Sequence, residues 1–300
     1  MAIRLVAIVL TLVVLAPSAV NAWLGCEDKL FFEYTMVDTA LEKFYQNTKG
    51  PTNWPASYKA RWDTPTKCAW DGNERGHPPP SGTRCLNGGW HKFPPETDGG
   101  LIFLEHTSGT AEGPLPAEFK AFQMTDFINL HGNKINGNIW DTGYHTFMHR
   151  LDLSENQMTG PLGDSFMQRN VNHAEIINLR GNKFDGPIPT SINTLLALTS
   201  LLLNKNQFSG QVPDLSHCQN LRNLNLADNQ LSGTIGTWVK ELKNLAWLEL
   251  QNNQFTGTLP ELGPKVSRFT AGGNKFSGAV PESYGKMGYL RHFDCTGCEI

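Results

Sequence analysis

The chain has 300 residues, of which 25 are Lys or Arg and 28 are Asp or Glu, so its formal net charge is −3 with His neutral. A chain of this length accommodates one large domain or two ordinary ones. The near balance of charge gives no general attraction to nucleic acid or to an anionic membrane, so neither is expected as a partner.

The first residues have the composition of a secretory signal peptide. Arg4 precedes an apolar stretch from Leu5 to Ala16, Pro17 follows, and cleavage is expected after Ala22. The alternative is a membrane anchor, but the apolar stretch is shorter than the roughly 20 residues that span a bilayer. We therefore expect residues 1–22 to be removed, and the mature chain to be secreted, without an integral membrane span. Its six Cys then lie in an oxidising compartment.

One pattern recurs from residue 101 to residue 300. The stretches LRNLNLADNQLSGTIG, from Leu221, and LAWLELQNNQFTGTLP, from Leu245, share the frame L-x-x-L-x-L-x-x-N-x-(L/F)-x-G-x-(I/L). We call the Asn position n. Its nine copies, 21 to 26 residues apart, are Gly109, Asn133, Asn156, Asn182, Asn206, Asn229, Asn253, Asn274 and Cys298.

Each position of the frame has a physical role. Apolar residues at n−5 and n−3 predict a short strand with one buried face, which copies of the unit must stack to cover. The chain turns at n, where an Asn amide can satisfy backbone groups of neighbouring turns. Gly at n+4 permits a tight backbone path. The sequence therefore predicts a solenoid of about nine turns, the last one incomplete.

This pattern resembles the plant-type extracellular leucine-rich repeat. The resemblance implies a curved, right-handed leucine-rich repeat solenoid, with a parallel β-sheet on the concave face and 3-10 or short helices and loops on the convex face. Residues 23–100 resemble the N-terminal cap of the same family, although an insertion displaces the second Cys of its motif. The resemblance implies a disulfide between Cys68 and Cys85, for which Cys26 remains a competing partner.

The family includes receptor ectodomains, receptor-like proteins and secreted polygalacturonase inhibitors, which recognise partners and do not catalyse reactions. The resemblance thus implies a secreted recognition protein that binds an extracellular protein, peptide or glycan, with inhibition of an enzyme as its narrower form. The alternative is a truncated receptor-like ectodomain, acting as a decoy or co-receptor. In that case the open last turn could also mediate self-association.

Alternation along each strand places three columns of side chains on the concave face. The first column, n−6, is Phe103, Phe127, Arg150, Ile176, Ser200, Asn223, Trp247, Arg268 and His292. The middle column, n−4, is Glu105, Asn129, Asp152, Asn178, Leu202, Asn225, Glu249, Thr270 and Asp294. The last column, n−2, is Thr107, His131, Ser154, Arg180, Asn204, Ala227, Gln251, Gly272 and Thr296.

Aromatic residues near arginine are typical of binding hot spots, so the concave face is the predicted binding site. The predicted contacts are Phe103, Phe127, Arg150, Asp152, Asn178, Arg180, Asn204, Trp247 and Glu249. For the two Phe, packing against the cap is an equally weighted alternative.

The sequence predicts no enzyme, cofactor or metal site. His145 and His149 have helical spacing, but no carboxylate completes a ligand set. The pair Cys295 and Cys298 has the spacing of redox motifs, yet both fall at inward positions of the frame, which favours buried thiols or a terminal staple. Cys218 is predicted to be a buried core thiol.

Overall fold

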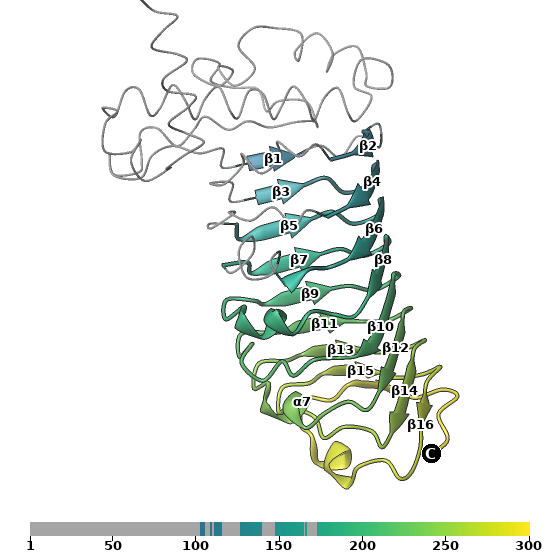
Figure 1. Ribbon diagram of the computed structural model, residues 1–300. Coiled ribbons are helices and arrows are strands. Elements are labelled where there is room, and N and C mark those ends of the chain that lie inside the picture. The colour runs from purple at the N-terminus through teal and green to yellow at the C-terminus, as the bar shows by residue number, and fades with distance from the viewer. Residues whose placement is uncertain are drawn as a thin grey trace, which may run out of the picture.

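The computed structural model describes residues 103–105, 109, 111–115, 127–139, 148–164, 166 and 173–300. Within them the chain winds into a curved stack of similar turns (Figure 1). The expected signal peptide (1–22), the expected cap (23–100) and the expected Cys68–Cys85 disulfide lie outside the described residues.

Each turn contributes one three-residue strand to a nine-stranded parallel sheet, which we call the inner sheet. Its strands are β1 (Phe103–Glu105), β3 (Phe127–Asn129), β5 (Arg150–Asp152), β7 (Ile176–Asn178), β9 (Ser200–Leu202), β11 (Asn223–Asn225), β13 (Trp247–Glu249), β15 (Arg268–Thr270) and β17 (His292–Asp294). They pair in register, so that Trp247 lies opposite Asn223 on one side and Arg268 on the other. The predicted solenoid with a concave parallel sheet is confirmed.

A second parallel sheet of eight strands, which was not predicted from the sequence, follows the turn at n. Its strands are β2 (Glu112–Pro114), β4 (Lys134–Asn138), β6 (Gln157–Pro161), β8 (Lys183–Gly186), β10 (Gln207–Gln211), β12 (Gln230–Gly233), β14 (Gln254–Gly257) and β16 (Lys275–Phe276). Neighbouring turns follow the same path up to the Gly at n+4, which has a positive φ in each of these turns, as at Gly233 (φ 80°). Because their backbones run parallel, they pair a second time.

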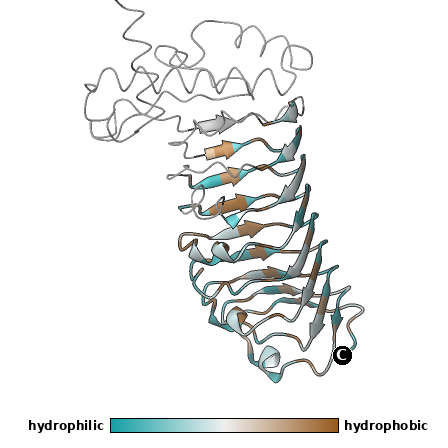
Figure 2. Cartoon of the chain, in the orientation of Figure 1, coloured by the Kyte–Doolittle hydropathy of each residue, from teal (hydrophilic) through white to brown (hydrophobic). Residues whose placement is uncertain are grey.

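Short helices occupy the convex side of the described turns. They are η2 (Thr190–Thr194), α7 (Trp238–Glu241) and η3 (Glu282–Lys286). The core between these helices and the two sheets includes the apolar positions n−5, n−3 and n+2, together with apolar residues of the return path such as Leu198, Val212 and Leu245. In Figure 2 the brown, hydrophobic colour recurs in the middle of successive strands of the inner sheet. At n+2, Phe184 stacks on Phe208 and Phe255 on Phe276, with ring centroids 6.2 and 6.0 Å apart.

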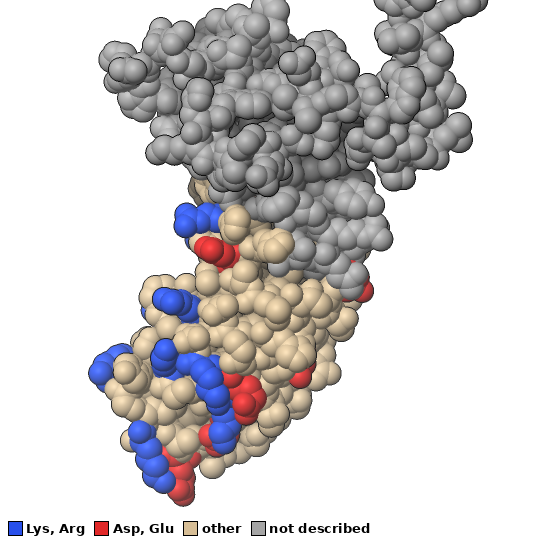
Figure 3. All heavy atoms as spheres, turned by 90° about the vertical axis from the view of Figure 1, so that its left-hand side faces the viewer, with Lys and Arg blue, Asp and Glu red and all other residues tan. Residues whose placement is uncertain are grey.

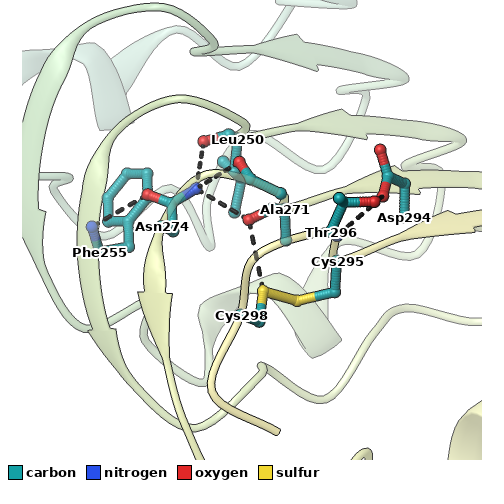
Figure 4. The surroundings of a disulfide bond; sticks show 9 residues. Leu250, Phe255, Ala271, Asn274, Asp294, Cys295, Thr296 and Cys298 are labelled. Carbon is teal, nitrogen blue, oxygen red and sulfur yellow. Dashed lines mark hydrogen bonds between the residues drawn. A yellow bond between two sulfur atoms is a disulfide. The ribbon is translucent and has the colours of Figure 1, made fainter.

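The buried Asn ladder has the predicted role. Asn274, for example, donates from Nδ2 to the carbonyl oxygen of Leu250 in the preceding turn at 2.9 Å, and to that of Ala271 in its own turn at 2.9 Å. Its Oδ1 accepts a hydrogen bond from the N–H of Phe255 at 3.0 Å. Asn274 therefore ties its own turn to the turn before it (Figure 4), and the other ladder Asn residues, such as Asn206 and Asn253, do the same.

The last turn has Cys298 in place of this Asn, and Cys298 forms a disulfide with Cys295 (Figure 4). Of the two alternatives predicted for the pair, the terminal staple is confirmed and buried free thiols are wrong. Both residues are only partly buried. Cys218 is a free thiol with no exposed surface, as predicted.

Candidate binding face

The first column contains the exposed large side chains of the inner sheet. Arg150 and Arg268 are exposed, and Trp247 has 53% of its surface accessible. Phe127 is half-buried, which places it at the surface beside Arg150, its register partner. The side chain of Phe103 lies outside the described residues. The outward direction predicted for the first column therefore holds for its long side chains.

The middle column makes hydrogen bonds within the protein. At five positions its side-chain oxygen accepts a hydrogen bond from the backbone N–H two residues later, at Asn129, Asp152, Asn178, Asn225 and Asp294. Asn and Asp form such turns readily. At Asp294 the hydroxyl of Thr296, and secondarily its backbone N–H, hold the pKa of the carboxyl below its ordinary value. The sequence signal for this use was the recurrence of Asn or Asp at n−4.

Asp152 is the centre of one network on this face. Its Oδ1 accepts hydrogen bonds from the N–H and the hydroxyl of Ser154 at 2.9 and 2.5 Å, and its Oδ2 accepts one from Asn178 Nδ2 at 2.9 Å. The Ser154 hydroxyl lies 2.8 Å from His131 Nδ1 and accepts a weaker bond from Asn178. Three neighbouring strands are thereby joined through side chains.

The combination of Ser154, His131 and Asp152 is not a hydrolase triad. In a triad the imidazole lies between the hydroxyl and the carboxylate and takes the hydroxyl proton. Here the hydroxyl lies between the other two, and its single hydrogen is donated to the carboxylate. Ser154 is also only 2% exposed. This cluster therefore orders the face and does not activate a nucleophile.

Glu249 is the centre of a second network. Its Oε2 accepts a hydrogen bond from Asn225 Nδ2 at 2.6 Å, and its Oε1 lies 2.9 Å from Arg268 Nε. The Glu249 side chain is 19% exposed and that of Arg268 47%, so the guanidinium is the more accessible partner. Asp152, Asn178 and Glu249, which were predicted as ligand contacts, thus use their side chains within the protein.

Arg180 forms an ion pair with Glu155, with Nε 3.2 Å from Oε1, and both side chains are more than two-fifths exposed. Such exposed pairs contribute little to stability. Glu155 has a left-handed backbone with φ 52°, an uncommon conformation for a non-Gly residue. The pair therefore places charge of both signs at this edge of the inner sheet.

In the last column, one predicted contact is corrected. Asn204 is only 8% exposed, and its Oδ1 is buried without a hydrogen-bond partner in the described part of the chain. Ser154 and Ala227 in the same column are buried too, whereas the longer Arg180 and His131 are exposed. The backbone already turns inward at n−2, so in the turns that another turn follows it is the long side chains that emerge there, whereas Thr296 in the last turn is exposed. Asn204 is therefore not part of the accessible face.

Charges are dispersed over the described surface. Figure 3 shows acidic and basic side chains interspersed along one side of the stack. Among the described residues, no group of three or more His, Cys, Asp or Glu could hold a metal ion. The helices in the same ranges are too short or too polar to cross a membrane.

Comparison with known proteins agrees with this architecture. Residues 173–195, 220–242 and 244–264 match the family model described as Leucine Rich Repeat. Receptor-like protein 39 of Arabidopsis thaliana is 25% identical over 138 residues, which are 38% of this chain and 16% of the relative. Receptor-like protein EIX2 of Solanum lycopersicum is 35% identical over 113 residues, 37% of this chain and 10% of the relative. The chain thus spans a small part of both relatives.

Solved structures with the same fold are plant receptors. The peptide hormone receptor RGFR1, in complex with RGF2, is similar with a TM-score of 0.59 and 25% identity over 65% of this chain and 32% of the receptor. The TDR receptor gives a TM-score of 0.61 and 28% identity over 66% of this chain and 35% of the receptor. The resemblance to plant-type extracellular leucine-rich repeat proteins is therefore confirmed.

Proposed function

We propose that this leucine-rich repeat chain is an extracellular recognition module of the receptor-like type, which binds a peptide or protein along its inner sheet. The observation that carries the proposal is Trp247, more than half exposed on a mainly polar sheet and directly beside Arg268 in register. Aromatic side chains and arginine are enriched at binding hot spots. A solvated sheet face has no need of a large exposed aromatic side chain.

The similar proteins support a peptide or protein as the class of partner. The curated relatives are receptor-like proteins, and RGFR1 is described in complex with RGF2. The proposed role is recognition without catalysis, and it applies equally to a free secreted chain and to one part of a longer receptor. Inhibition of an enzyme would be a special case of the same surface, with the enzyme as the bound protein.

A photo-crosslinking residue tests the surface. A benzoyl-phenylalanine replaces Trp247 in one variant and Gln254, on the second sheet, in a matched control, since both positions are exposed. Each full chain is irradiated with the extracellular fraction of its source. The proposal expects a partner joined at position 247 and absent at position 254.

The captured partner is then produced pure and its affinity for the chain measured. It is expected to bind the native chain and to lose at least about tenfold in affinity for Trp247→Ala, as truncation of a hot-spot residue typically does. A partner that crosslinks equally at both positions would contradict the inner sheet as the binding surface. So would a partner whose affinity is the same for the native chain and for Trp247→Ala.

A further inference from the structure

We propose that the first column is the part of the inner sheet that contacts the ligand, and that the ligand is an extended acidic peptide lying along the stack. This inference rests on the proposed function of the inner sheet and specifies its ligand. It combines three observations: which column has unused hydrogen-bonding groups, which charge that column has, and how far apart its charges lie.

The middle and first columns differ in how their polar groups are used. In the middle column Asp152, Asn178, Asn225 and Glu249 direct their side chains to backbone N–H groups and to each other. In the first column, the side chains of Arg150 and Trp247 form no hydrogen bond or ion pair with any residue that the structure describes. A ligand therefore meets satisfied groups over the middle column and free donors over the first.

Arg268 also keeps an accessible guanidinium. Its Nε lies 2.9 Å from Glu249 Oε1, and 47% of the Arg268 side chain remains exposed. Because the guanidinium is more exposed than the carboxylate beneath it, a ligand reaches the positive charge first. Arginine presents paired donors that match a carboxylate in a bidentate geometry.

The charge of the first column is of one sign. Its members whose side chains the structure describes are Phe127, Arg150, Ile176, Ser200, Asn223, Trp247, Arg268 and His292. None of these is Asp or Glu, whereas acidic residues occur in the middle column. Complementarity across an interface then favours a ligand with negative charge over this column.

The spacing of the two arginines sets the form of the ligand. Arg150 begins β5 and Arg268 begins β15, five strands further along the sheet. At about 4.8 Å per strand they are roughly 24 Å apart, which an extended peptide covers with about seven residues. Each arginine has an aromatic neighbour in register, Phe127 beside Arg150 and Trp247 beside Arg268.

Less exposed side chains separate these two arginine-aromatic pairs. Ile176, Ser200 and Asn223 lie between them in the first column, where Ser200 is buried and the other two are half-buried. The first column therefore has an exposed arginine-aromatic pair near each end and less exposed side chains between them. A peptide with two acidic residues about six to eight positions apart, each next to a bulky apolar residue, is complementary to both ends.

The test is a selection of random peptides displayed on phage, each about twelve residues long so that the ~24 Å span is covered with residues to spare, against the full chain. Enriched peptides are synthesised and their affinities measured for the native chain, Arg150→Gln, Arg268→Gln and the control Arg222→Gln. Arg222 is exposed but lies outside the three columns.

The inference expects enriched peptides with paired acidic residues, at least about tenfold weaker binding to each first-column variant, and affinity that falls with added salt. Unchanged affinity for Arg222→Gln is expected. Enriched peptides that are neutral or basic, or that bind both first-column variants as tightly as the native chain, overturn the inference and leave the proposed function standing. If no peptide is enriched but a partner still crosslinks at position 247, the inference fails and the proposed function stands. If no peptide is enriched and no partner crosslinks there, the inference and the proposed function both fail.

Discussion

Asn206 reaches across one full turn of the solenoid to Leu179, where its Nδ2 donates a hydrogen bond to the carbonyl oxygen at 2.9 Å. Its Oδ1 accepts a hydrogen bond from the N–H of Phe184, also in the preceding turn, at 3.1 Å. Two further bonds go to carbonyl groups of its own turn. Because Asn206 is buried, water cannot replace these partners. The side chain at n therefore holds neighbouring turns together as well as shaping its own.

Asn206→Ala is expected to lower the free energy of unfolding by roughly 2–4 kcal/mol, because several buried backbone groups lose their partners at once. Denaturation by urea, followed by circular dichroism, measures the change. Asn220→Ala is the control, since Asn220 is exposed and makes a single bond to the carbonyl of Leu196. A loss below about 0.5 kcal/mol is typical of an exposed position. Similar losses in both variants would contradict the proposed importance of the ladder.

Asp152 and Arg150 belong to the same strand, but truncation is expected to lower the stability of the protein only at Asp152. Asp152→Ala removes the partner of the N–H and hydroxyl of Ser154, which is buried, so a loss of about 1–3 kcal/mol in stability is expected. Arg150→Ala leaves no group without a partner and is expected to change stability by less than about 0.5 kcal/mol.

The same two variants separate scaffold from ligand contact. Thermal melting of each gives the stability effect, and binding of a ligand of the native chain gives the affinity effect. Arg150→Ala is expected to weaken binding in a fully folded protein. A strongly destabilised Arg150→Ala, or a fully stable Asp152→Ala, would reverse the assignment of the two columns.

The sequence predicted the frame of this fold because buried residues recur at fixed positions in it. Leu201 and Leu203, for example, are buried at n−5 and n−3, so the residues between and before them must point outward. The alternation of apolar and polar residues along a strand predicts only whether a side chain points inward or outward. It could not show that Asn204, with a short side chain at an inward turn, stays covered, or that Asp152 and Asn178 bond to each other. Those results depend on side-chain length and on neighbours a full turn away.

The second sheet was missed for a related reason. Strands such as β12 end at a Gly with positive φ, so their apolar alternation stops after a few residues and looks like a loop in one copy of the repeat. The pairing arises only because the next turn follows the same path. A repeating loop in a solenoid is therefore a candidate strand.

Lys205 occupies the turn position n−1 with a left-handed backbone, φ 56°. Its side chain is exposed and forms no hydrogen bond or ion pair within the described ranges. Glycine adopts this conformation without the steric cost of a Cβ atom. Lys205→Gly is therefore expected to raise the free energy of unfolding by about 0.5–1 kcal/mol. The control is Lys183→Gly in strand β8, where glycine is expected to lower stability by about the same amount. Thermal melting measures both variants. If Lys205→Gly lowered the melting temperature as Lys183→Gly is expected to do, the backbone of Lys205 would not be strained.

Cys218 tests the burial of the convex side. Burial raises the pKa of its thiol from 9.0 to about 11, with a smaller contribution from Asp214. The thiolate is the reactive form, so Cys218 is expected to resist a disulfide reagent at pH 8 in the folded chain and to react on unfolding. Peptide mass spectrometry assigns the label to a residue, since the chain has other cysteines. Rapid labelling of Cys218 itself in the folded protein would contradict its burial.

The same thiol gives stability a defined dependence on alkaline pH. Above pH 9 an unfolded chain releases the Cys218 proton, while the folded chain retains it up to about pH 11. Fewer protons are then bound in the unfolded state, so stability falls as the pH rises through this window. Cys218→Ala removes this contribution and keeps those of other groups. The difference in free energy of unfolding between native and variant is therefore expected to be constant below pH 9 and to change in favour of the variant between pH 9 and 11. A difference that stays constant across both ranges would mean that the thiol has the same pKa in the folded and unfolded chain.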